Sequence, residues 1–205
     1  MNMNYISRGT DKLVIEKFIP IENTNTLDKP IGGLWACEYT PNSNYVSAWD
    51  QYQVSVGDVD MDEWYTINTI LFNLKSDARI YTIDSHEDLI RLFTDFEWKS
   101  SEYIRCLTNS KDCYFWSAFE EERYEGDRVD FYLDLAIEAE EELKNIPYEK
   151  KVIDFEELSS KYDAIFLTQD GLNEIKNSSD SHFSAWDIPS LLVLNFNAIA
   201  DQQSL

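Results

Sequence analysis

The chain has 205 residues, of which 43% are hydrophobic and 27% charged, a composition typical of a folded globular domain. It carries 39 acidic and 17 basic residues, and the net charge of −22 argues against direct binding to nucleic acid or to an anionic membrane, because like charges repel. Disordered acidic chains are poor in aromatic residues, whereas this chain is 14% aromatic, so we expect the acidity to belong to a folded protein.

The cysteines and histidines indicate neither a disulfide scaffold nor a metal site. Cys37, Cys106 and Cys113 are an odd number without paired spacing, which favours a reducing compartment. His86 and His182 lack the spacing of a zinc finger, so we expect no metal. The first residues contain no apolar leader and no apolar run is long enough to cross a bilayer, so the sequence predicts a soluble, cytoplasmic protein.

The first half of the chain is rich in β-branched and aromatic runs, which predict strands. One of these runs follows a turn at Pro30–Gly33, and Ser47 is suited to cap a short helical turn that carries Trp49 and Tyr52. The predicted strands cover residues 5–8, 13–21, 34–39, 66–74 and 79–83.

The middle of the chain has the pattern of helices. Ser85 followed by Asp88 resembles a capping box ahead of an amphipathic stretch that runs to residue 96. A longer helix is predicted over residues 128–145, and it ends before Pro147.

A short helix opening at Asp154 and two closing strands complete the predicted order of elements. The strands are predicted at residues 164–168 and 190–196. Strands, then helices, then strands predict a single α+β domain over residues 1–205, with a mixed or antiparallel sheet. An acidic helical insert is expected within it at about residues 84–158.

No phosphate-binding loop, dinucleotide fingerprint, zinc-protease motif or serine-hydrolase motif occurs, but three positions carry residue types that binding sites use. Arg8 precedes Gly9 at the end of the first predicted strand, where a guanidinium could bind a diphosphate with two hydrogen bonds. Trp35 and Tyr39 share one face of a strand and could stack on a flat heterocycle. Asp187 stands just before a buried strand, which would hold its carboxylate rigidly. The simpler interpretations are a surface arginine, a core aromatic pair and a turn-capping aspartate.

Several segments together resemble a widespread set of bacterial and phage proteins with a Lys-Pro-x-Gly-Gly-Leu-Trp motif. The matching pieces extend from about residue 5 to 196 and are 29–35, Trp49, 77–84, 88–89, 162–168 and 186–190. This layout resembles the ADP-ribosyltransferase-like superfamily. Its members carry an Arg or His on a first strand, a small polar or aromatic motif on a second, and an acid or Gln that opens a later strand. Arg8, the strand at residues 34–37 and Asp187 occur in that order.

The resemblance implies that the chain uses NAD to modify a protein target, in the setting of phage–host conflict. Asp187 would bond the ribose and stabilise the oxocarbenium ion that forms as nicotinamide leaves, Arg8 would hold the diphosphate, and Tyr5, Trp35 or Tyr39 would stack on nicotinamide. The chain departs from the arginine-bearing branch of the superfamily at two motifs. A Trp-Ala-Cys motif replaces Ser-Thr-Ser, and Asp187 replaces Glu. These changes leave open a different acceptor, or ligand binding without transfer.

A non-enzymatic function fits the charge pattern as well. Eleven acids and two arginines between Glu120 and Glu142 give that segment a charge of −9. Such a surface could mimic nucleic acid and inhibit a basic nucleic-acid-binding machine, or it could be only a solvated helix face. A glycosidase with paired carboxylates is a third hypothesis, but no spacing selects a pair. The acids predicted to contact a basic partner are Glu138, Glu140, Glu141 and Glu142.

Overall fold

The computed structural model describes eight stretches of the chain. They are residues 3–10, 12–23, 29–41, 43–57, 64, 67–97, 153–178 and 186–205. Within these stretches no helix is both long and apolar enough to cross a membrane.

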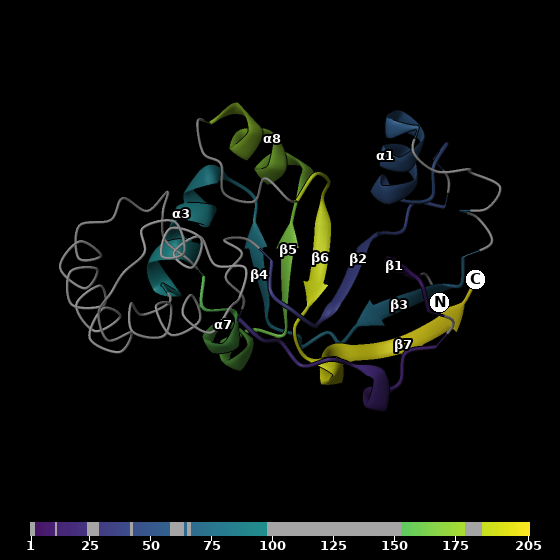
Figure 1. The fold of residues 1–205 in the computed structure, drawn as a ribbon, viewed down its shortest axis with the longest axis horizontal. Coiled ribbons are helices and arrows are strands. Elements are labelled where there is room, and N and C mark those ends of the chain that lie inside the picture. The colour runs from purple at the N-terminus through teal and green to yellow at the C-terminus, as the bar shows by residue number, and fades with distance from the viewer. Residues whose placement is uncertain are drawn as a thin grey trace, which may run out of the picture.

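The described residues form a seven-stranded mixed sheet with helices packed against it, so the predicted α+β class is confirmed (Figure 1). The strand order is β4-β5-β6-β2-β1-β3-β7. β4 and β5 pair in parallel, and every other neighbouring pair is antiparallel. The strands are β1 (Tyr5–Arg8), β2 (Leu34–Glu38), β3 (Thr69–Leu74), β4 (Ile80–Ile83), β5 (Ala164–Leu167), β6 (Ser190–Val193) and β7 (Ile199–Ser204).

The α-helices begin at residues whose side chains accept a hydrogen bond from the first turn, as N-caps do. Ser47 caps α1 (Ala48–Val56), and Ser85 caps α3 (His86–Asp95) through the backbone N–H of Asp88, as the capping pattern predicted. Asp154 caps α7 (Phe155–Lys161), and Thr168 caps α8 (Gln169–Asn177). Two short 3₁₀ helices, η1 (Ile15–Lys17) and η3 (Phe196–Ala198), lie in the connections.

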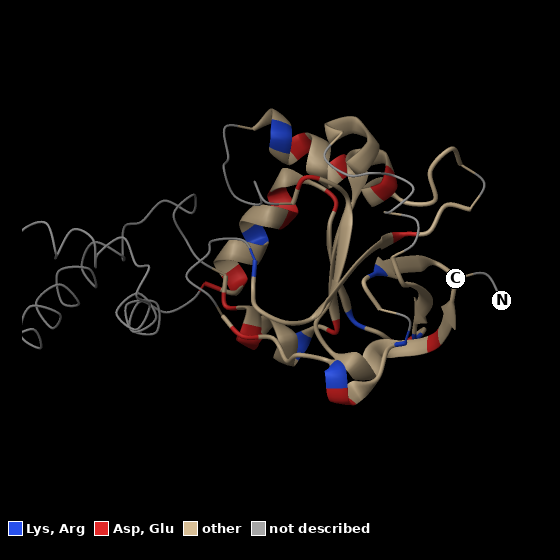
Figure 2. Ribbon diagram, turned by 45° about the vertical axis from the view of Figure 1, so that its right-hand side comes forward, with Lys and Arg blue, Asp and Glu red and all other residues tan. Residues whose placement is uncertain are grey.

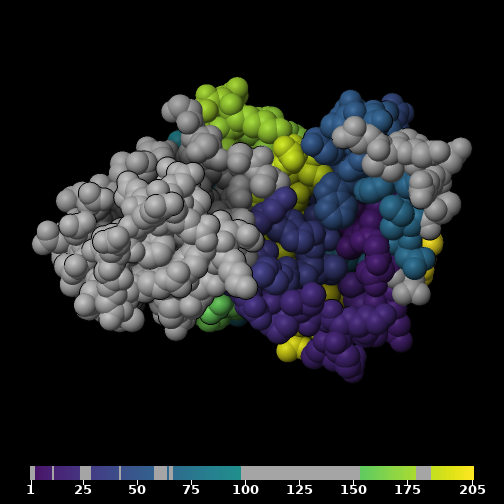
Figure 3. All heavy atoms as spheres, in the orientation of Figure 1, coloured from purple at the N-terminus to yellow at the C-terminus, as the bar shows by residue number. Residues whose placement is uncertain are grey.

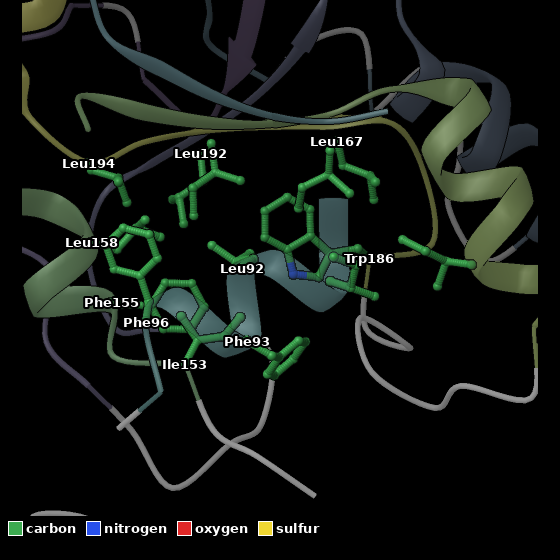
Figure 4. Packing of buried hydrophobic residues seen from close by; sticks show 14 of the residues in the cluster. Leu92, Phe93, Phe96, Ile153, Phe155, Leu158, Leu167, Trp186, Leu192 and Leu194 are labelled. Carbon is green, nitrogen blue, oxygen red and sulfur yellow. The ribbon is translucent and has the colours of Figure 1, made fainter. Parts of the chain in front are cut away.

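Alternation along the strands builds two apolar cores on opposite faces of the sheet. In β5, Ile165 and Leu167 face α3, α7 and α8, while Ala164 and Phe166 face the other way. The helical face holds the larger cluster, in which Phe93, Phe155 and Trp186 are almost completely buried (Figure 4). The opposite cluster joins residues of β1, β2 and β3 to residues of β5 and β6, and the sheet twists strongly around it (Figure 1).

The predicted strand over residues 13–21 is wrong, because this segment forms η1 and contributes few backbone ladder bonds. The β-branched and aromatic composition that predicted a strand does not reflect burial here, since Ile15 and Ile19 are more than half exposed. The side-chain amide of Gln202 satisfies the backbone of Leu13 instead, accepting from its N–H at 2.8 Å and donating to its carbonyl at 2.9 Å.

Both ends of the predicted acidic insert belong to the core. Leu89 and Leu92 of α3 and Leu158 of α7 are fully buried. Glu97 and Ile153 form an isolated antiparallel bridge, so the two described ends that flank residues 98–152 lie side by side. The helices at residues 86–95 and 155–161 therefore belong to the described domain, whereas residues 98–152, with the predicted helix at 128–145, lie outside the described residues.

Candidate functional site

The three motifs singled out in the sequence lie on neighbouring strands. β2 is the middle strand, with β1 on one side and β6 on the other. Ile6 of β1 pairs with Cys37, and Ala36 pairs with Leu191 of β6. The segment that carries Asp187 therefore runs into a strand directly beside the one that carries Trp35.

Trp35 and Asp187 line one cavity of about 220 Å³, called here the aromatic cavity. α1 forms one wall, and the segment before β6 forms another. The space-filling view shows the late residues of the chain, in yellow, between α8 and α1 (Figure 3). The lining residues are Lys29, Trp35, Trp49, Tyr52, Gln53, Trp186, Asp187, Ile188 and Ser190.

Aromatic rings and two charged groups define the chemistry of this cavity. The rings of Trp35 and Trp186 meet edge to face, with centroids 4.7 Å apart. The Lys29 ammonium lies 5.4 Å from the centre of the Trp35 ring, within the range of a cation–π contact. Asp187 accepts a hydrogen bond on its backbone carbonyl from the Lys176 ammonium at 2.9 Å. Its exposed carboxylate makes no ion pair within the part of the chain that the structure describes.

The double glycine of the Lys-Pro-x-Gly-Gly-Leu-Trp motif places Trp35. Gly32 and Gly33 both have positive φ, of 84° and 69°, which side-chain-bearing residues rarely adopt. A Cβ on Gly33 would stand 2.7 Å from the Leu192 side chain, so only glycine lets β2 start this close to β6. The tight turn predicted at this motif is confirmed, and it directs Trp35 into the cavity.

Arg8 does not line the aromatic cavity, because it is committed to a buried ion pair. Its Nη2 donates to Asp50 Oδ1 at 2.6 Å and its Nη1 donates to Thr69 Oγ1 at 3.0 Å. The Asp50 side chain, fully buried in α1, also accepts from Trp64 Nε1 at 2.6 Å and from Ser47 Oγ at 2.9 Å. The prediction of an exposed diphosphate clamp therefore needs correction: Arg8 fastens α1 to the sheet.

The two tyrosines of the predicted site lie elsewhere. Tyr5 pairs with Glu38 and packs against Phe72 and Phe166, on the face of the sheet opposite to Trp35. It cannot stack on the same ligand ring as Trp35, because strand alternation turns it to the other side. Tyr39 shares the face of Trp35 but packs in the small cluster beneath α1 rather than in the cavity.

The cavity contains residues that motif reasoning did not assign to it. Lys29 opens the Lys-Pro-x-Gly-Gly-Leu-Trp motif, Trp186 precedes Asp187, and Trp49 is one of the matching pieces, so all three had a signal in the matching segments. Tyr52 was predicted only as a member of a helical turn. Gln53 had no signal, since only the position of α1 over the sheet brings it to the cavity.

Other candidate chemistry is limited. No group of three or more His, Cys, Asp or Glu residues that could hold a metal occurs among the described residues. Burial raises the pKa of the Cys37 thiol to about 12, which keeps it protonated and unreactive at neutral pH. The predicted partner-binding residues Glu138, Glu140, Glu141 and Glu142 lie outside the described residues.

Comparison of the chain with protein-family models, with curated proteins and with solved structures finds no match in any of the three. The function is therefore argued from the geometry of the site.

Proposed function

We propose that the chain is an ADP-ribosyltransferase-like protein that binds the nicotinamide half of NAD in the aromatic cavity. One observation carries the proposal: Trp35 and Asp187, far apart in the sequence, line the same cavity. The order of the strands supports the proposal as well, because the three segments that carry the motifs belong to or lead into the neighbouring strands β1, β2 and β6.

The residues of the cavity fit the parts of this ligand. Trp35, Trp49 and Tyr52 offer ring surfaces to a flat heterocycle, and the buried Trp186 ring supports Trp35 edge to face. Asp187 would accept hydrogen bonds from the ribose hydroxyls and stabilise positive charge on the sugar as the ribose–nicotinamide bond breaks and nicotinamide leaves with the electron pair.

Lys29, rather than Arg8, would meet a phosphate in this cavity. Among the described residues that line it, Lys29 is the one with a basic side chain, whereas the Arg8 side chain is 5% exposed and bound to Asp50. Local charge matters here, because the net charge of −22 repels an anionic ligand at long range and salt screens that repulsion. Arg8 then acts as a positioning residue for α1, which carries Trp49, Tyr52 and Gln53.

The size of the cavity limits what it can enclose. Ligand pockets for drug-sized molecules measure roughly 300–1,000 Å³, so the 220 Å³ here suits a ring with its sugar rather than a whole dinucleotide. Nicotinamide riboside and nicotinamide mononucleotide, which differ by one phosphate, are therefore the appropriate probes.

Calorimetry or ligand-observed NMR with these two probes tests the proposal. Lys29→Gln should weaken the mononucleotide about tenfold or more, because a charge-assisted hydrogen bond is lost, and leave the riboside within a few-fold. Trp35→Leu should weaken both. Lys12→Gln, at an exposed lysine outside the cavity, is the matched control. Absence of binding by both probes at millimolar concentration, or equal effects of the two lysine variants, contradicts the proposal.

An acidic interaction protein is the second candidate. The specific observation is that Glu97 pairs with Ile153, so the described residues that flank the range 98–152 lie side by side. That range includes the stretch of charge −9 in the sequence. A catalytic core and an acidic docking segment for a basic protein are compatible in one chain.

A further inference from the structure

A second cavity lies beside the aromatic cavity. It measures about 440 Å³ and is called here the polar cavity. The end of β2, the following loop, the first turn of α1 and the start of α8 contribute to it. Pro189 lines the polar cavity, while its chain neighbours Ile188 and Ser190 line the aromatic one, so a single extended segment separates the two spaces.

The lining of the polar cavity is rich in groups that both donate and accept hydrogen bonds. Amides come from Asn44, Gln51 and Gln169, and hydroxyls come from threonine, serine and tyrosine side chains. Among the described residues of the lining, Glu38 is the only charged one, and none of them is basic. The exposed Glu38 carboxylate has no ion-pair partner among the residues that the structure describes.

Hydrogen bonds hold the rim of the polar cavity in place before any ligand arrives. The Thr40 hydroxyl donates to the Tyr45 carbonyl at 3.0 Å, and the Ser43 hydroxyl donates to the carbonyls of both residues. On the opposite side, the amide of Gln169 donates to Asn173 at 2.8 Å, which leaves its carbonyl oxygen for another donor. A pre-organised rim lowers the entropy cost of binding.

These features select the chemical class of the ligand. An anion would meet the Glu38 carboxylate and no basic side chain from the described lining, and the net charge of −22 would repel it as well. A cation would lie at the positive end of the α1 dipole, since Ser47, Ala48 and Gln51 of the first turn line the space. An apolar ligand would leave the amides and hydroxyls without partners. A neutral ligand with several hydroxyl groups avoids all three penalties.

We infer that the polar cavity binds a sugar ring with a vicinal diol, and that Glu38 accepts hydrogen bonds from both diol hydroxyls. The two carboxylate oxygens match two adjacent hydroxyl donors, and the half-buried Tyr45 ring can cover the apolar face of the sugar. The diol can come from the ribose of a nucleoside or from a hexose. This inference goes beyond the proposed function and does not depend on nicotinamide chemistry.

NMR titration of the ¹⁵N-labelled full chain tests the inference. The probes are adenosine, 2′-deoxyadenosine, methyl β-D-ribofuranoside and methyl β-D-glucopyranoside. Sugar binding should shift the side-chain amide signals of Asn44, Gln51 and Gln169. Glu38→Gln should weaken binding about tenfold or more, because charged hydrogen bonds to the diol are lost. Glu16→Gln, at an exposed glutamate of η1, is the matched control and should change nothing.

Each outcome either identifies the source of the diol, a nucleoside or a carbohydrate, or overturns the inference. Tighter binding of adenosine than of 2′-deoxyadenosine and the glucoside identifies a nucleoside ribose, and preference for the glucoside identifies a carbohydrate. Equal binding of adenosine and 2′-deoxyadenosine overturns it, because the diol is then not recognised. Failure of every probe to shift the three amides also overturns it. Absence of binding by both nicotinamide riboside and nicotinamide mononucleotide at the aromatic cavity, while adenosine still shifts the three amides, removes the proposed function and leaves the inference standing.

Discussion

Asp50 determines what Arg8 can do. A buried carboxylate needs partners, and here it accepts hydrogen bonds from Arg8, Trp64 and Ser47 while its side chain is 0% exposed. The guanidinium also lies 5.1 Å from the centre of the Trp64 ring. A ligand phosphate that recruited Arg8 would leave this carboxylate buried without its cation, so the ion pair is the stable arrangement.

Breaking this pair from one side should therefore be costly. Arg8→Met should lower the free energy of unfolding by about 3–5 kcal/mol, because an uncompensated charge stays buried. Arg8→Met combined with Asp50→Asn should cost less than the two single changes added together. Urea unfolding followed by circular dichroism measures these differences.

The Arg79–Asp163 pair supplies the control for this prediction. Arg79 Nε and Nη2 each donate to the Asp163 carboxylate at 3.1 Å, but the Arg79 side chain is 55% exposed. Arg79→Met should cost about 1 kcal/mol or less, as exposed ion pairs do. If Arg8→Met costs no more than Arg79→Met, Arg8 does not fasten α1.

The Asp187 carboxylate forms no contact that holds the fold together among the described residues. The bond that involves this residue uses its backbone carbonyl, which accepts from Lys176, and the carboxylate is exposed. Asp187→Asn should keep NAD affinity within a few-fold but lower nicotinamide release by orders of magnitude, because the charge acts in the transition state. Labelled-nicotinamide release at saturating NAD measures the effect.

Two companion variants make the Asp187 experiment decisive. Asp187→Glu should retain part of the activity if the longer side chain still reaches the sugar. Asp201→Asn, at an exposed residue of β7, should leave activity and melting temperature unchanged. Wild-type turnover by the Asn variant would exclude Asp187 from the reaction.

At the scale of elements, the turn into β2 connects the sequence motif to the aromatic cavity. The Gly33 N–H donates to the Ile19 carbonyl at 2.9 Å, which closes this turn. A Cβ on Gly32 would lie 2.7 Å from the same carbonyl oxygen and even closer to that of Pro20. These neighbours are backbone atoms, which cannot move aside at a low cost in free energy as the end of a flexible side chain can.

Gly32→Ala should consequently destabilise the domain by more than Gly9→Ala. Both glycines have positive φ, of 84° and 92°, so the conformational cost of adding a Cβ is about 1 kcal/mol in each. A Cβ on Gly9 meets nothing within 4 Å, whereas that on Gly32 meets the backbone. Thermal unfolding of the two variants compares them, and equal destabilisation would show that the turn can relax.

The elements that could be predicted are those whose apolar pattern matches their burial. β5 and β6 are almost wholly buried, and runs of apolar residues marked them. β7 carries a polar sequence with mostly exposed side chains, so only its pairing with β3 makes it a strand. Trp35 was predicted as a site residue because it is an aromatic on a strand that begins with glycines, and Asp187 because it precedes a buried apolar run. Tyr5 and Arg8 lie elsewhere because of sheet register and of a partner on α1, which local sequence does not report.

At the scale of the whole molecule, the acidity is distributed. Residues 98–152 hold 14 acidic and 8 basic residues, a charge of −6 out of −22, so most of the excess lies elsewhere in the chain. Asp and Glu are spread over several of the described elements rather than gathered on one (Figure 2). A general attraction for basic partners is thus expected even without a dedicated docking segment.

Charge-reversal variants distinguish a dedicated docking segment from a general attraction that depends only on net charge. One variant carries Lys at positions 138, 140, 141 and 142, and a matched variant carries Lys in place of the exposed residues Glu16, Asp77, Asp95 and Asp201. In each variant the four substitutions raise the net charge by 8, from −22 to −14. Poly-lysine is the probe, and its affinity is measured over a series of salt concentrations.

If the 138–142 acids form a docking surface, the first variant should bind poly-lysine more weakly and with a shallower salt dependence than the second. Surface substitutions of this kind should leave the melting temperature of both variants close to that of the parent chain. Equal loss of affinity in the two variants would assign the attraction to net charge alone, and the acidic interaction function would then have no surface of its own.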